Sequence, residues 1–164
     1  MNEEILIVLG VLIALWFIWM IFIPLFVITE NFIEKRIRKT NTSKKIARKL
    51  KGKTKYQTLR KVYDYINKTY YGQGHVFDHN AFLEALDYSI SERLLLRRKR
   101  FLWCTNQLAL LTSLLINTGQ FTKEEIALKS TLGRTLSAHF YSVVNIKNKR
   151  FKIDPYYNIF KSVK

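Results

Sequence analysis

Apolar residues recur along this chain at spacings that predict three helices. The first is expected to end before Gly72 and to bury one face, made of Tyr56, Leu59, Val62, Tyr63 and Ile66. A second is expected over residues 78–87, where Asp78 fits the N-cap position. The third opens at Cys104 and stops at Gly119, with its apolar positions at Leu108, Leu110, Leu111, Leu114 and Leu115.

The pattern of side chains changes after residue 121. Thr122-Lys-Glu-Glu125 has the form of a capping box and predicts a short helix. Residues 140–146 and 150–153 are β-prone runs on either side of a polar turn, and together they predict a β-hairpin. With the turn near residues 147–148, Asp154 is expected opposite Tyr141, on the strand face that also carries His139.

The amino-terminal part is continuously apolar. Residues 5–28 carry no charge and would form a helix of about 36 Å, which is long enough for the hydrocarbon core of a bilayer. A cleaved signal peptide is the alternative, but the segment before the run is Met1-Asn2-Glu3-Glu4 and the apolar run is too long. The sequence therefore predicts a single transmembrane helix.

Charge is distributed unevenly, with 28 Lys and Arg against 12 Asp and Glu and a net charge of +16. Positive residues that follow an apolar span favour the cytoplasmic side, so we expect the N-terminus outside and the bulk of the chain in the cytoplasm. The lipid bilayer and its anionic headgroups are the expected partners of this basic segment. Its predicted membrane-surface residues are Lys35, Arg36, Arg38, Lys39, Lys44, Lys45, Arg48 and Lys49. Binding of nucleic acid is the alternative, but no recognition motif accompanies the charge and we expect no specific nucleic-acid partner.

Composition limits the class of protein. An apolar content of 48% excludes a disordered chain, and a single cysteine excludes a disulfide framework and a four-thiolate metal site. His75 and His79 would need further ligands to hold zinc, so we expect no metal and no cofactor. The expected organisation is a short tail (1–4), a transmembrane helix (5–28), a basic linker (29–53) and a folded domain (54–164).

Cys104 is the first candidate for chemistry. At the start of a helix, free backbone N–H groups and the helix dipole favour a thiolate, which is the nucleophilic form of cysteine. The alternative is that Cys104 is only a small buried apolar side chain. Asn106 and Gln107, in the same first turn, are expected to cap the helix or face solvent.

Three fragments together resemble the transglutaminase-like cysteine hydrolases. They are Trp103-Cys104 with the apolar helix to Gly119, His139-Phe-Tyr141, and Phe151-Lys-Ile-Asp154-Pro155. The resemblance covers about residues 54–160. It implies an α+β fold in which a Cys-bearing helix packs on an antiparallel β-sheet, an arrangement that papain-like enzymes share.

The resemblance also implies a reaction. Cys104 would be the nucleophile, His139 its base and Asp154 the group that orients the imidazole, in a membrane-anchored protease or amidase acting on a protein or peptide. Transamidation stays open beside hydrolysis. Candidate oxyanion donors are the backbone N–H of Cys104 and the side chains of Trp103, Gln73 and Tyr71. Two alternatives are a catalytically inactive scaffold held at the membrane and a basic lipid or nucleic-acid tether in which Cys104 is incidental.

Overall fold

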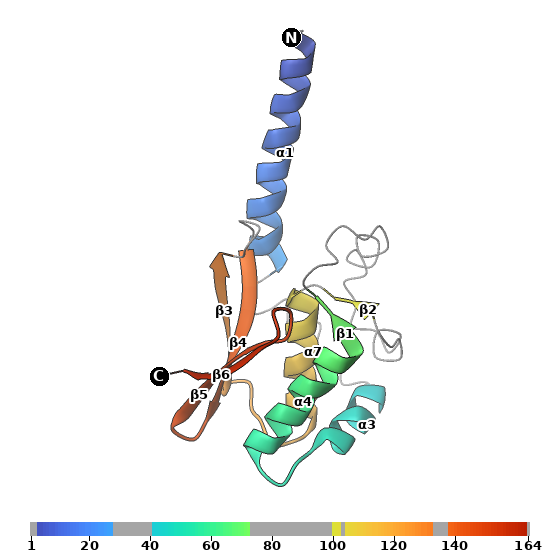
Figure 1. Ribbon diagram of the computed structural model, residues 1–164, viewed down its shortest axis with the longest axis vertical. Coiled ribbons are helices and arrows are strands. Elements are labelled where there is room, and N and C mark those ends of the chain that lie inside the picture. Colours follow the sequence, from blue (N-terminus) through green and yellow to red (C-terminus); the bar gives the residue numbers. More distant parts are fainter. Residues whose placement is uncertain (1–2, 28–40, 73–99, 103, 133–137, 164) are drawn as a thin grey trace. The chain divides into compact units, whose positions relative to one another are not determined.

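The structure is a computed structural model that describes residues 3–27, 41–72, 100–102, 104–132 and 138–163 (Figure 1). Contacts divide the chain into two compact units. One comprises residues 1–35 with 131–139, and the other residues 36–130 with 140–164. Each unit is described by itself. The predicted helix at 78–87 lies outside the described residues.

Helix α1 (Glu3–Val27) makes up most of the first unit. Its large apolar side chains between Ile5 and Ile18 are 46% to 65% exposed. Among the residues that the structure describes, no helix combines the length and apolar character needed to cross a membrane. The prediction of a transmembrane helix over residues 5–28 is therefore wrong for this structure.

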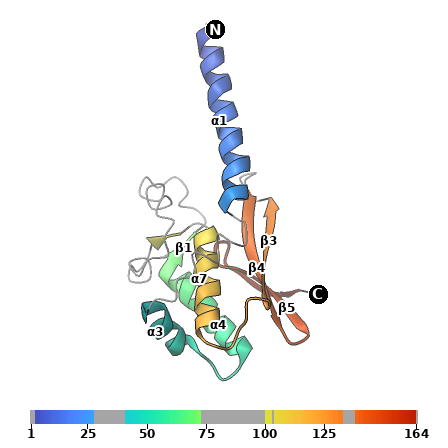
Figure 2. The ribbon, with the colours of Figure 1, turned by 180° about the vertical axis from the view of Figure 1, so that it is seen from behind.

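Three helices of the second unit pack on one another. Both α3 (Asn41–Leu50) and α4 (Lys55–Thr69) contact α7 (Cys104–Asn117), and all three are seen from opposite sides in Figures 1 and 2. The predicted helix before Gly72 and the predicted helix that begins at Cys104 are both confirmed, as α4 and α7. Gly119 follows the end of α7 with a φ of 72°. Of the predicted apolar face of α4, only Tyr56 stays largely exposed, because it lies in the first turn of that helix.

Helix α3 occupies part of the segment expected to be a linker. Ser43 and Ala47, four positions apart, are buried, while the lysines and arginines of α3 are exposed. The side-chain amide of Asn117 in α7 donates to Ser43 at 3.2 Å. A basic run therefore forms a helix here because its two small residues pack against α7.

Four strands form a sheet in the order β3-β4-β5-β6. They are β3 (Ile126–Leu132), β4 (Ala138–Ile146), β5 (Lys149–Asp154) and β6 (Ile159–Val163). The predicted hairpin is confirmed, since β4 and β5 pair antiparallel from Ile146–Lys149 to Ser142–Ile153. Helices and an antiparallel sheet make the fold α+β, as expected.

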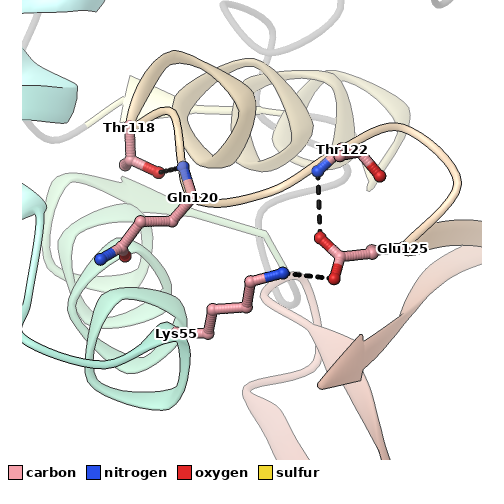
Figure 3. Close-up of polar contacts among 5 residues, drawn as sticks. All are labelled: Lys55, Thr118, Gln120, Thr122 and Glu125. Atoms are coloured by element: carbon pink, nitrogen blue, oxygen red, sulfur yellow. Dashed lines mark hydrogen bonds and ion pairs between the residues drawn. The ribbon is translucent and has the colours of Figure 1, made fainter. Parts of the chain in front are cut away.

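The capping-box segment does not start a helix. One carboxylate oxygen of Glu125 accepts from the Thr122 N–H at 3.1 Å, as a capping box requires, but the other accepts from the Lys55 ammonium of α4 (Figure 3). The chain then enters β3 at Ile126. The short-helix prediction is wrong because this carboxylate joins the loop to α4 and the following residues pair in the sheet.

Two short strands pair in parallel elsewhere in the second unit. Tyr70 of β1 (Tyr70–Tyr71) is opposite Arg100 of β2 (Arg100–Phe101). The Leu102 N–H continues this pairing with a 3.1 Å hydrogen bond to the Tyr71 carbonyl. The segment that leads to Cys104 is thus fixed to the end of α4.

Candidate active site

Cys104 is the first residue of α7 and is partly exposed. The helix start has no acidic residue in its first turn. A thiol at this position has the free N–H groups of the first turn beside it and no carboxylate in that turn to oppose a thiolate. The predicted placement of Cys104 at a helix N-terminus is confirmed.

Gln107 holds Leu102, two residues before this cysteine, against α7. Its side-chain Nε2 donates to the Leu102 carbonyl at 3.0 Å, and the side chain is only 1% exposed. Asn106 is also buried, at 4%. The expectation that these two side chains face solvent is wrong because both are buried, and the Gln107 amide donates to a carbonyl group instead of capping the helix N–H groups.

Asp154 ends β5 and is 1% exposed. Its Oδ1 accepts from the Tyr157 N–H at 3.3 Å, and the turn closes with a bond from the Asn158 N–H to the Pro155 carbonyl at 3.2 Å. A carboxylate held this way has one oxygen engaged in shaping its own turn.

His139 lies in β4 and is 4% exposed. Because side chains alternate along a strand, it shares a face of β4 with Tyr141, and one further step of the β4–β5 register sets Asp154 opposite Tyr141. His139 is the last residue of the first compact unit, whereas Cys104 and Asp154 belong to the second. The distance from the imidazole to the thiol therefore stays a prediction.

Tyr156 connects the other two predicted residues. Burial, and after it the negative charges of Cys104, Tyr157 and Asp154 in that order of importance, raise the pKa of its phenol to about 12. Both Cys104 and Asp154 thus lie within electrostatic reach of one hydroxyl group. The raised pKa keeps this hydroxyl protonated, and able to donate a hydrogen bond, at neutral pH.

The ring of Tyr156 packs against Gly72. A β-carbon added at Gly72 would stand 2.5 Å from Cδ2 of that ring and 2.9 Å from the Tyr156 carbonyl oxygen. Only glycine allows β1 to end this close to the turn after Asp154. Sequence reasoning missed Tyr156, and its one signal is its position two residues after Asp154.

Of the predicted oxyanion side chains, the structure describes Tyr71 but not Trp103 or Gln73. Tyr71 lies in β1, half-buried, with its carbonyl bound to Leu102. Trp103, Gln73, His75 and His79 lie outside the described residues, as do Lys35, Arg36, Arg38 and Lys39. Within the described ranges, no group of three or more His, Cys, Asp or Glu side chains is arranged to hold a metal ion.

Comparison with known proteins adds no relative. No family model, curated protein or solved structure matches the chain. The residues around Cys104 are therefore the basis on which a function can be inferred.

Proposed function

We propose that this protein is a thiol-dependent acyl-transfer enzyme, a cysteine protease or amidase with Cys104 as nucleophile, His139 as base and Asp154 as the group that orients the imidazole. One observation carries the proposal: Cys104 at the start of α7 and Asp154 at the end of β5 both raise the pKa of the same half-buried phenol, that of Tyr156. Catalytic sites typically bring together residues that are distant in the sequence, here a nucleophile and a carboxylate.

The three side chains and water account for every bond and proton in the reaction. His139 removes the proton from the Cys104 thiol, and the thiolate attacks the carbonyl carbon of an amide. The tetrahedral intermediate collapses, the C–N bond breaks, and the amine leaves with the proton carried by the imidazolium. Water, activated by the neutral imidazole, then attacks the thioester to release a carboxylic acid and restore the thiol.

The negative oxygen of the intermediate needs donors. The Cys104 backbone N–H is one, since the first N–H groups of a helix have no partner within it. The Tyr156 hydroxyl is a second candidate beside Tyr71, because it stays protonated and lies within electrostatic reach of Cys104. Hydrolysis is favoured over crosslinking, because water is always present as the acceptor.

The chain has one cysteine, which makes the experiment specific. The full chain, kept in solution by a non-ionic detergent, is treated with p-nitrophenyl acetate, and acetylation of Cys104 is followed by mass spectrometry with release of p-nitrophenol. We expect a burst of nitrophenol and a thioester on Cys104 at about pH 7. His139→Ala should lower the acylation rate by at least about a hundredfold, in line with the loss of a general base.

Two controls complete the test. His79→Ala removes another imidazole of the chain and should leave the rate within about twofold, while Asp154→Asn should lower it by at least about tenfold. Circular dichroism checks that each variant keeps its helices and strands. Acylation that is equally slow in the parent and in His139→Ala would contradict the proposal and favour a catalytically inactive scaffold.

A further inference from the structure

A hollow of about 500 Å³ lies between the loop that follows α3 and the first turns of α4, and we call it the α4 hollow. It is lined by Lys51, Gly52, Lys53, Tyr56, Gln57, Arg60 and Lys61. None of these residues belongs to the proposed active site. The volume lies within the range of small-molecule sites.

Hydrogen bonds fix the floor of the α4 hollow. The Gly52 N–H donates to Thr58 Oγ1 at 2.7 Å, and the Gly52 carbonyl accepts from Gln120 Nε2 at 3.0 Å. The Lys53 N–H donates to Gln57 Oε1 at 3.1 Å, and Thr54 caps the helix through the Gln57 N–H. A loop bound at successive residues is pre-organised, so a ligand would not have to order it.

Gly52 is required for this shape. A β-carbon there would stand 2.8 Å from the Gln57 Cβ and 3.1 Å from the Thr58 nitrogen. The loop therefore passes directly against the first turn of α4, and the lysines on either side of Gly52 flank the opening.

The charge of the α4 hollow is unbalanced. Four of its seven lining residues are cationic and none is acidic. Within the described part of the chain, Arg60 pairs with Asp64 at 3.2 Å, whereas no ion pair involves Lys51, Lys53 or Lys61. Glu125, the other paired carboxylate, binds Lys55 and does not line the hollow. Cations gathered around one concavity attract a multiply charged anion.

We propose that the α4 hollow binds a phosphate-bearing anion with at least two negative charges. Lysines bind phosphate as point charges, and three of them, Lys51, Lys53 and Lys61, line the hollow. The exposed ring of Tyr56 gives the rim an apolar side on which an organic group of the ligand can rest. A free polyphosphate and a phosphorylated lipid headgroup share this chemistry, and the experiment separates the two.

Inorganic pyrophosphate is titrated calorimetrically into the full chain in detergent, at fixed ionic strength. The test variant is Lys53→Gln with Lys61→Gln. The matched control is Lys44→Gln with Lys45→Gln, which removes the same charge from exposed positions of α3 outside the hollow. We expect the test variant to weaken binding at least about tenfold and the control less than about threefold. Both pairs of lysines are exposed, so circular dichroism should show an unchanged fold.

The second arm uses vesicles of phosphatidylcholine with or without one-tenth phosphatidylinositol bisphosphate. Binding of pyrophosphate that the test variant alone weakens supports a free phosphate ligand. Binding only to the phosphorylated vesicles, weakened by the test variant alone, supports a lipid headgroup. The absence of binding to both probes, or equal losses in the test and control variants, overturns the proposal.

Discussion

Gly72 lies against the ring of Tyr156, so closely that a single added methyl group would collide with it at 2.5 Å. Gly72→Ala should therefore destabilise the protein by about 1–3 kcal/mol, as over-packing does elsewhere. It should also displace Tyr156 and change the reactivity of Cys104 toward iodoacetamide. Chemical denaturation and alkylation rates measure the two effects.

Gly119→Ala is the matched control for that substitution. Its β-carbon would meet nothing within 4 Å, but the φ of 72° disfavours any L side chain, by about 1 kcal/mol. We expect a loss of stability without a change in the alkylation rate of Cys104. Equal effects on alkylation in the two variants would show that Gly72 acts only through stability.

Tyr156 should ionise well above the ordinary pKa of a tyrosine, which is 10.0. The absorbance titration of the parent minus that of Tyr156→Phe should give a pKa of about 12. In Cys104→Ser the neighbouring negative charge is removed, so the pKa of Tyr156 should fall, but only in part, because burial is the larger cause. A pKa near 10 in the parent would mean that the phenol is solvent-exposed.

Lys55 and Glu125 should make stability depend on pH. The hydrogen bond from Lys55, and then that from the Thr122 N–H, lower the pKa of Glu125 below 4.5 in the folded state. Its contribution is therefore present above that value and is lost as the pH falls through the folded-state pKa. The parent should exceed Glu125→Gln in unfolding free energy by at most about 1 kcal/mol at neutral pH, since both side chains are partly exposed.

The difference should disappear at acid pH, once the carboxylate is protonated in both states. Lys55→Met should give the same loss at neutral pH, and the double variant should add little to either. Additive losses would show that the two side chains contribute through other contacts.

Asn158→Asp should keep the stability of the parent, whereas Asn158→Ala should lower it. Its Oδ1 accepts from the Tyr63 hydroxyl at 2.8 Å and from Asn67 Nδ2 at 2.7 Å, and its φ is 56°. Asn158→Ala loses both bonds and adds backbone strain, for a loss of about 2 kcal/mol in unfolding free energy. Asn158→Gly should lose about half as much. Asn158→Asp keeps the acceptor and should stay close to the parent, and thermal denaturation ranks the three.

Local sequence patterns predicted the elements whose stabilising contacts are local or periodic. The leucines of α7 recur at helical spacing, so the sequence predicted both the start of this helix at Cys104 and its termination by Gly119. The hairpin of β4 and β5 followed from two β-prone runs about a short turn, in which Lys147 adopts a φ of 53°.

Contacts between distant residues were not visible in the sequence. Helix α3 depends on a bond between Ser43 and Asn117, and the Thr122 segment depends on Lys55, 70 positions before Glu125. Tyr156 lies near Cys104 only because the chain turns after Asp154. A capping box or a basic run gives no indication of such partners, because each pattern reports only neighbours along the chain.

The parallel pairing of β1 with β2 joins residues 30 positions apart, immediately before Cys104. Closing a loop of that length costs entropy that is recovered only when both strands are in place, so the surroundings of the thiol are complete only after β1 and β2 have paired. A newly synthesised or partly unfolded copy would hold an ordinary cysteine. If Cys104 is the nucleophile proposed here, rapid alkylation at neutral pH would mark the folded molecule, and the rate at which it develops during refolding would report when β1 and β2 pair.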